Sequence, residues 1–414
     1  MIDLKHRNKR QNFFLILMLG ALNTITPFSI DMYLPAFPKI AIDLHTGIQN
    51  VALSVSAYFL GFAVGQILYG PLLDRFGRKR PLYIGLSLYI IATIICSTST
   101  TINELLILRF IQALSGCVAS VSAMAMVRDF FPPDKSASLI SLLILILGVS
   151  PMLAPTAGSF IVTSFGWRYV FIFLAIIVCI ILIVVFLFLP EGQTPNISIS
   201  LKPKPIINGF KNILLHPQFY IFSLAGTFSF SGLFVYVAGS PAIFMDQFHV
   251  SPKTYGGIFA LLSVGFIGSS QLNHLLTRKY KSEEIFRVTS IIQTIASALY
   301  FIGIINAWYG LATNMIFLFI ILSCAGLTYP NAAAVALSPF KKNAGSAAAL
   351  LGFIQIGIGG LISSGIGFLH RKGSYPTSLI MVITSSIGLL ILLLGKSKRI
   401  KIRVAAEINT VHHY

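Results

Sequence analysis

Long apolar segments follow one another along the whole chain, separated by short polar stretches. A helix that crosses a lipid bilayer needs roughly 20 mostly apolar residues, and about twelve segments reach this length. They lie near residues 12–34, 49–71, 81–99, 103–127, 136–160, 168–189, 218–243, 254–275, 285–305, 308–337, 344–369 and 375–395. The alternating pattern of a membrane β-barrel is absent, which leaves helices as the spanning elements. We therefore expect an all-α polytopic membrane protein with twelve transmembrane helices.

The longest polar stretch divides these segments into two sets of six. It runs from Glu191 to Pro217 and is rich in proline, without a sustained apolar run. Large transporters are commonly built from two such halves, with the substrate site between them near the bilayer midplane. We expect two six-helix bundles in four regions: 1–190 for the first bundle, 191–217 for a cytoplasmic linker, 218–395 for the second bundle and 396–414 for a basic cytoplasmic tail.

Composition and charge support a membrane protein and argue against nucleic-acid binding. Hydrophobic residues make up 56% of the chain and charged residues 10%, whereas about a quarter of a soluble domain is charged. The formal net charge is +18. If the N-terminus is inside, Lys and Arg are divided 24 to 5 between inside and outside segments. Because short cytoplasmic loops carry excess Lys and Arg, this charge is an orientation signal, and we expect both termini in the cytoplasm.

Sequence signatures of an enzyme or a cofactor protein are missing. The chain has no Walker A loop, no His-Glu-x-x-His motif and no paired-cysteine metal spacing. Its four cysteines, which fall inside apolar segments, are expected to pack as small apolar residues. We therefore expect no enzymatic activity, no cofactor and no metal, and an ion or substrate gradient as the energy source.

Glu104 and the other acidic residues are at span ends or in loops, and Asp31 alone lies within an expected span, toward its outer end. A charged residue at the centre of a membrane helix costs about 2.5–3.5 kcal/mol on insertion scales, and such residues usually face an aqueous pathway. This placement favours a proton-exchanging site at Asp31. The alternative is that Asp31 lies at the outer interface and only solvates the helix end.

Arg109 is the other charge within a span. Gln112 follows one helical turn later and Gly116 two turns later, so the three residues share one face. A buried arginine needs acceptors, which an aqueous cavity, Asp31 or carbonyls of the first helix could supply. We expect Arg109 and Gln112 to act in coupling; the alternative is an arginine that only joins two helices.

A short charged turn follows the second span. It contains Gly70, Asp74, Arg75, Gly77 and Arg78, and Asp129 follows the fourth span on the same side. One arrangement pairs Arg78 with Asp129 while Asp74 caps a neighbouring helix. Such pairs could hold a gate closed; a static anchor for topology is the other interpretation.

The fifth span carries Pro151, Pro155 and Gly158, which predict a kinked helix with a bare face. Such a helix serves either bending or tight packing. Aromatic residues that could line a cavity include Tyr33, Tyr58, Phe62, Phe234, Tyr236 and Phe353.

The charged turn resembles the signature loop of the major facilitator superfamily. Gly70, Leu72, Asp74, Arg75, Gly77, Arg78 and Lys79 carry that resemblance. Further segments are similar to the bicyclomycin-resistance (Bcr/CflA) branch of bacterial drug–proton antiporters. These segments are Asp31–Pro38, Arg109–Gln112, Ala154–Gly158, Pro330–Ala334 and Asn343–Ala347.

The resemblance implies the major facilitator fold and export of small amphipathic molecules in exchange for protons. It assigns proton and substrate exchange to Asp31, the proton-relay arginine to Arg109, and the antiporter motif of helix five to Pro155 and Gly158. It also implies a monomer in the bacterial cytoplasmic (inner) membrane. Ala154 stands where the family has glycine, and Asn23 where some relatives have a second carboxylate.

Three alternatives stay open. The chain could export one endogenous metabolite or siderophore, or it could be a proton-coupled importer, which the proline–glycine motif argues against. A membrane enzyme or a sensor would need a catalytic cluster or an added soluble domain, and the sequence shows neither.

Overall fold

The structure is a computed structural model in which residues 9–131, 133–192, 195–196, 210–340, 344–369, 371 and 373–411 are described. Within these ranges the secondary structure is entirely helical. Six long helices precede the linker: α1 (Lys9–Asp31), α3 (Ile48–Phe76), α4 (Lys79–Thr98), α5 (Ile102–Phe130), α6 (Pro133–Ser164) and α7 (Arg168–Phe188). Six follow it: α9 (Pro217–Pro241), α10 (Pro252–Leu276), α11 (Ser282–Ile305), α12 (Leu311–Leu337), α13 (Ala344–Phe368) and α14 (Ser374–Val411).

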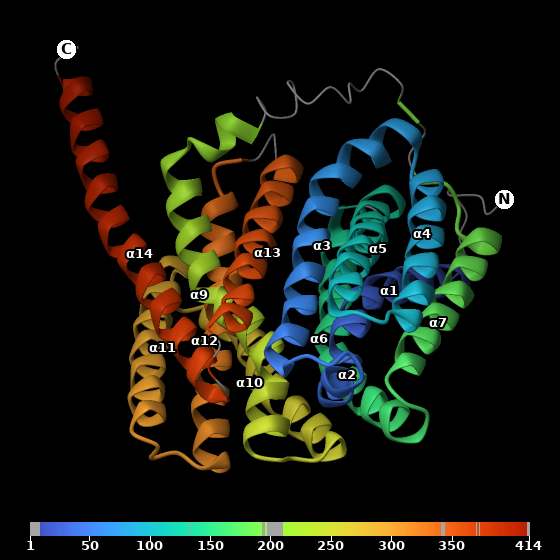
Figure 1. Cartoon of the computed structure of the whole chain (residues 1–414). Helices are drawn as coiled ribbons and strands as arrows, with labels where there is room; N and C mark the ends of the chain where they lie inside the picture. The colour runs from blue at the N-terminus through green and yellow to red at the C-terminus, as the bar shows by residue number, and fades with distance from the viewer. Residues whose placement is uncertain are drawn as a thin grey trace.

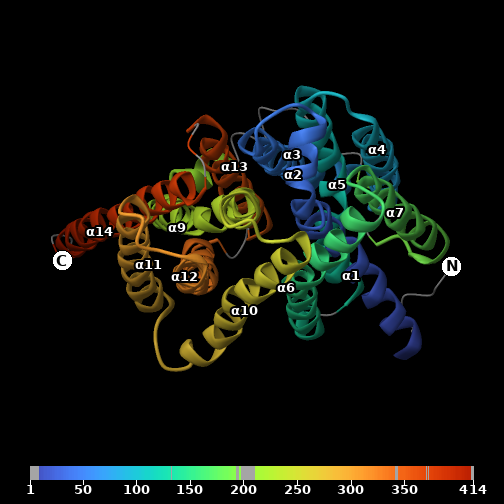
Figure 2. The ribbon, with the colours of Figure 1, turned by 60° about the horizontal axis from the view of Figure 1, so that its bottom comes forward.

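The two sets of helices form two bundles that lie side by side (Figures 1 and 2). We call α1 and α3–α7 the first bundle and α9–α14 the second bundle. The face on which α3 joins α4 and α7 ends is called the linker face, and it is at the top of Figure 1. The opposite side, where α2 (Phe37–Asp43) lies, is called the far face.

Eleven helical segments in the described ranges are long and apolar enough to cross a membrane. The long helix α6 corresponds to the expected fifth span and completes the twelve. The predicted fold class is therefore confirmed. Most of the predicted linker, residues 197–209, lies outside the described residues, and the four predicted regions stay a prediction.

The helix that begins each bundle does not continue as a regular helix to the far face. α1 ends at Asp31 and is followed by a 3₁₀ turn, η1 (Leu34–Ala36), with Pro35 inside it, and then by α2. In the second bundle, Pro241 ends α9, and a π-helical turn, η2 (Ala242–Gln247), follows. Proline has no backbone N–H to donate to the preceding turn, which accounts for both interruptions. The first interruption places Asp31 at a helix end rather than inside a helix.

The bundles meet along two helix pairs, α3 with α13 and α6 with α10. Glycines allow the close approach. A side chain at Gly360 of α13 would press against Phe59, and one at Gly256 of α10 against the backbone of Thr156. The hydroxyls of Ser56 and Ser363 are 2.7 Å apart across the α3–α13 contact. The α6–α10 contact therefore brings the proline–glycine segment of α6 against the second bundle.

Candidate functional site

Asp31 is a buried carboxyl at the junction of the two bundles. It is the last residue of α1 and is 5% exposed. None of the ion pairs in the described part of the chain includes it. The alternative interpretation was that Asp31 only solvates a helix end at the outer interface. A carboxyl with so little exposure does not fit that interpretation.

Gly158 of α6 fixes the backbone that carries Asp31. A side chain at Gly158 would collide with the carbonyl group of Met32, the residue after Asp31. Only glycine has no Cβ atom, so α6 can touch the end of α1 at this point. The bare helix face expected from Pro155 and Gly158 is present, and it lies against the Asp31 segment. Pro151 and Pro155 both lie inside α6, as expected.

Tyrosines of the second bundle face Asp31. The carboxyl is close enough to Tyr236 of α9 and Tyr255 of α10 for electrostatic interaction with both. The Tyr255 hydroxyl is 2.8 Å from the Ser240 hydroxyl. Among the described residues, the buried hydroxyl of Tyr236 has no hydrogen-bond partner. Asp31 from the first bundle thus lies within electrostatic range of an unsatisfied donor from the second.

Arg109 is completely buried inside the first bundle. Its Nη1 donates to Oε1 of Gln112 at 2.6 Å, and its Nη2 donates to the carbonyl oxygen of Ser29 at 3.0 Å. Gln112 in turn donates to Oγ1 of Thr93 on α4 at 2.7 Å. The predicted shared face of Arg109 and Gln112 is confirmed. Of the acceptors considered from the sequence, a carbonyl of the first helix is the one found.

Aromatic rings surround the Arg109 guanidinium. Its Cζ atom lies 4.4 Å from the ring centre of Tyr58 and 4.8 Å from that of Tyr33. Cation–π contacts of this kind strengthen when they are shielded from water. Arg109 and Asp31 do not form an ion pair; they are connected through the backbone of α1, because Ser29 lies two residues before Asp31.

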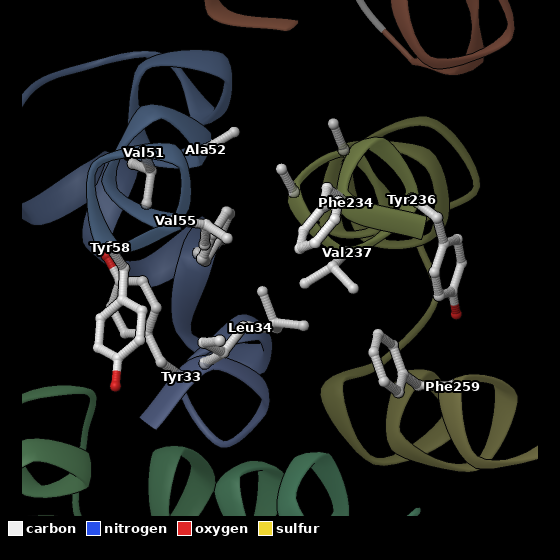
Figure 3. Close-up of a cluster of buried hydrophobic side chains, with 14 of the residues drawn as sticks. Tyr33, Leu34, Val51, Ala52, Val55, Tyr58, Phe234, Tyr236, Val237 and Phe259 are labelled. Carbon is white, nitrogen blue, oxygen red and sulfur yellow. The ribbon is translucent and has the colours of Figure 1, made fainter. Parts of the chain in front are cut away.

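The expected cavity aromatics contact different partners. Tyr33 and Tyr58 belong to the Arg109 surroundings, whereas Tyr236 stacks on Phe259 with ring centres 5.3 Å apart. Figure 3 shows Tyr33 and Tyr58 on one side of the bundle contact, and Tyr236 and Phe259 on the other. Phe234 packs edge-on against Phe59 of α3, with ring centres 4.7 Å apart.

The other two expected aromatics belong to different clusters. Phe62 is buried in the same large core cluster as Tyr33, Tyr58 and Tyr236, whereas Phe353 packs against a separate cluster of the second bundle. Both residues pack against apolar neighbours. That either one lines a cavity stays a prediction.

The charged turn forms a cluster on the linker face. Nε of Arg78 donates to Asp129 at 2.8 Å, and its Nη1 donates to Asp74 at 2.7 Å. Burial alone would lower the pKa of Arg78, but the bonds to Asp129 and Asp74 outweigh it and raise that pKa above its ordinary value. The expected pair of Arg78 with Asp129 is present, and Asp74 joins it.

Glu191, not Asp74, caps the neighbouring helix, so that part of the expectation was wrong. Oε1 of Glu191 accepts from the backbone N–H of Arg78 at 2.7 Å and of Lys79 at 3.1 Å, at the N-terminus of α4. The next residue, Gly192, passes so close to Asp129 that a side chain there would meet its carboxylate. Asp74 is occupied by Arg78 one helical turn away, which leaves the cap to the first residues of the linker.

Glycines in the turn have unequal roles. Gly77 ends α3 with φ at +82°, a conformation that favours glycine. Gly70 has open space where a side chain would be, so no close approach requires glycine there. Arg75 lies in the last turn of α3, with its guanidinium 5.7 Å from the ring centre of Phe76.

A second polar cluster, on the far face, had no signal in the sequence. Oδ2 of Asp43, the last residue of α2, accepts hydrogen bonds from Nε1 of Trp167 at 2.8 Å and from Arg168. Lys39 of α2 donates to the carbonyl oxygen of Val162 at 2.7 Å. These bonds fasten α2 to the end of α6 and the start of α7. The bonded residues are more than a hundred positions apart in the chain, so no local sequence pattern predicts these contacts.

No three His, Cys, Asp or Glu side chains in the described ranges lie close enough to hold a metal ion. The site therefore offers one lone carboxyl, an arginine bound to backbone and amide oxygens, and tyrosine hydroxyls. Such groups can exchange a proton and donate hydrogen bonds, but they supply no nucleophile activated by a base.

Comparison with known proteins agrees with this architecture. The family model of the Major Facilitator Superfamily matches residues 19–364. A Bacillus subtilis protein named uncharacterized MFS-type transporter YdgK is 30% identical over 92% of this chain and 94% of its own length. A bicyclomycin resistance protein homolog of Haemophilus influenzae is 27% identical over 89% of this chain and 92% of its own. Multidrug resistance protein D of Escherichia coli is 26% identical over 93% of this chain and 95% of its own.

Solved structures share the fold at low sequence identity. A bacterial homologue of the human lysosomal transporter Spinster superposes with a TM-score of 0.70 at 16% identity, over 95% of this chain and 99% of that one. A D-xylose–proton symporter gives a TM-score of 0.69 at 15% identity, over 92% of this chain and 97% of that one. Because the family model covers most of the sequence and the helices adopt the same arrangement, the chain belongs to the major facilitator superfamily of membrane transporters.

Proposed function

We propose that the protein is a proton-coupled antiporter that exports drugs or other small amphipathic molecules by alternating access. The observation that carries the proposal is the position of Asp31, a buried lone carboxyl between two bundles. Apolar surroundings disfavour the charged form of a carboxyl, and hydrogen-bond donors favour it. Motion of one bundle relative to the other would change both the apolar surroundings of the carboxyl and its hydrogen-bond donors. This supports proton exchange at Asp31.

In this mechanism, deprotonated Asp31 is stabilised by the tyrosine hydroxyls of the second bundle and by the cargo. Proton uptake removes the charge and weakens that attraction, so the cargo leaves on the outer side. Arg109 holds the Ser29 carbonyl and Gln112, and it positions the end of α1 on which the carboxyl is mounted. We propose that the linker-face cluster of Arg78, Asp74 and Asp129 acts as a gate that opens when the bundles rock.

Drug export is favoured over export of one metabolite by the names of the relatives, which include bicyclomycin and multidrug resistance proteins. We further propose that the functional unit is a monomer with both termini in the cytoplasm, divided at residues 191–217 into the two rocking halves. The positive charge of the linker-face segments supports this orientation.

The test uses reconstituted vesicles with a pH gradient and a substrate identified by proton release. Replacing Asp31→Asn should abolish pH-driven efflux while the protein stays folded, because the amide cannot exchange a proton. Asp246→Asn is the matched control: it removes a carboxylate from the η2 turn on the far face and should transport normally.

Normal export by Asp31→Asn vesicles would refute the assignment of the proton site. Drug-susceptibility profiles of a deletion strain, set against metabolite analysis of its medium, separate broad drug export from export of a single compound. Counterflow in vesicles of known orientation separates export from import.

A further inference from the structure

A groove on the outside of the first bundle lies where α1 begins and α7 ends. It encloses about 480 Å³ and is lined by Arg10, Gln11, Phe13, Phe14, Leu15, Met18, Phe188 and Pro190. Phe14 and Phe188 together form one aromatic wall of the groove, with ring centres 5.6 Å apart in an edge-to-face contact. Phe13 is 68% exposed beside them. The groove belongs neither to the Asp31 site nor to the charged cluster of Arg78.

The polar end and the apolar end of the groove are distinct. Arg10 lies in the first turn of α1, at the linker face, and its side chain is exposed. None of the ion pairs in the described ranges uses Arg10. From Phe13 to Met18 the lining is apolar, and this part of α1 continues into the depth of the expected membrane span. The order of one base followed by apolar walls matches the order of a phospholipid, which has a headgroup and then acyl chains.

We propose that this groove binds an anionic phospholipid, with the headgroup phosphate on Arg10 and one acyl chain lying along the aromatic wall of Phe13, Phe14 and Phe188. A guanidinium binds phosphate oxygens through paired N–H donors and cannot lose its charge. Lys5, Arg7 and Lys9 precede Arg10 in the sequence, so positive charge gathers before this helix. Basic pockets between transmembrane helices are suited to acidic headgroups.

An apolar groove alone would take any lipid, so the charge must decide the specificity. A base close to the membrane surface contributes about 1 kcal/mol to the binding of acidic lipid. Loss of Arg10 should therefore weaken binding of phosphatidylglycerol about fivefold, the ratio that this energy corresponds to, and leave phosphatidylcholine unchanged. Loss of an aromatic wall should weaken both lipids.

The experiment measures lipid binding to the purified full-length protein in detergent by native mass spectrometry. The protein is titrated separately with phosphatidylglycerol, phosphatidylcholine and water-soluble glycerol phosphate. Arg10→Gln should lose the preference for phosphatidylglycerol, and Phe13→Ala should bind both lipids less. Arg80→Gln is the matched control, because Arg80 is an exposed base on the same face but is not part of the groove lining.

Equal losses in Arg10→Gln and Arg80→Gln would show a diffuse electrostatic field and overturn the proposal. Binding of glycerol phosphate as tight as that of phosphatidylglycerol would show a site for soluble anions, and it would overturn the lipid assignment. If Arg10→Gln does not elute as a monodisperse protein, Arg10→Lys takes its place. The Lys variant keeps the charge and should retain a preference for phosphatidylglycerol; loss of that preference would contradict an electrostatic headgroup contact.

Discussion

Arg109 of α5 donates a hydrogen bond to the backbone carbonyl of Ser29 at 3.0 Å, two residues before the buried Asp31. The arginine contacts the backbone of α1 close to the carboxyl. Among the described residues, no ion pair joins the two side chains. Its position therefore matters more than its charge alone, because a carbonyl acceptor requires a donor at a fixed place.

Arg109→Lys tests this geometry. Lysine keeps the charge, but its single ammonium group cannot reproduce the planar fork that reaches Gln112 and Ser29 together. We expect pH-driven transport to fall at least about tenfold and the protein to lose about 1–3 kcal/mol of stability, because buried acceptors lose their donor. Transport assays and thermal unfolding in the same detergent measure both. Transport at the unsubstituted rate would show that charge alone suffices.

Tyr236→Phe removes a buried hydroxyl that has no partner among the described residues. Stability should therefore change little, whereas the pH at which transport is half-maximal should shift if this hydroxyl serves Asp31. The comparison is Tyr255→Phe, which breaks the bond to Ser240 and should cost about 1 kcal/mol of stability. An unchanged pH profile in Tyr236→Phe would exclude the hydroxyl from proton exchange.

Gly158→Ala places a methyl group against the Met32 carbonyl. Backbone cannot move aside as a side-chain tip can, so we expect a lower melting temperature and impaired transport. Gly70→Ala is the control within α3, where a methyl group meets open space. Because alanine favours a helix by roughly 0.5–1 kcal/mol over glycine, Gly70→Ala should be neutral or stabilising. Equal melting temperatures for the two variants would contradict the packing argument.

Glu191→Ala removes the carboxylate that caps α4 and fastens the start of the linker. The loss should be about 0.5–2 kcal/mol, as for other helix caps, and limited proteolysis near residues 190–196 should become faster. Glu104→Ala is the comparison, because Glu104 belongs to the capping box of α5 on the far face. That variant should lose stability without faster cleavage near the linker. Cleavage at equal rates would mean that Glu191 does not hold this segment.

Much of the fold could be predicted because spacing and composition record it. Long apolar runs predicted the helices, and the three-residue interval from Arg109 to Gln112 predicted a shared helix face. Opposite charges after the second and fourth spans predicted the pair of Arg78 with Asp129.

The rest depends on contacts that leave no mark in local sequence. The Ser29 carbonyl is backbone, so no side chain signals its role as an acceptor. Glu191 looks like part of a proline-rich linker, yet it reaches a helix that begins more than a hundred residues earlier in the chain. The aromatic residues were named as candidates to line a cavity, but ring type does not state direction, and the sequence did not indicate that Tyr33 and Tyr236 lie on opposite sides of the bundle contact.

The segment after Asp31 is tethered at its far end, where the Asp43 carboxylate holds Trp167 and Arg168. On the other side of Asp31, Arg109 donates a hydrogen bond to the Ser29 carbonyl. The backbone that carries the carboxyl is therefore held both before and after Asp31. The backbone around Asp31 can therefore move little when the carboxyl gains or loses a proton. We expect the mechanical response to appear instead in α9 and α10, which contact this segment from the second bundle.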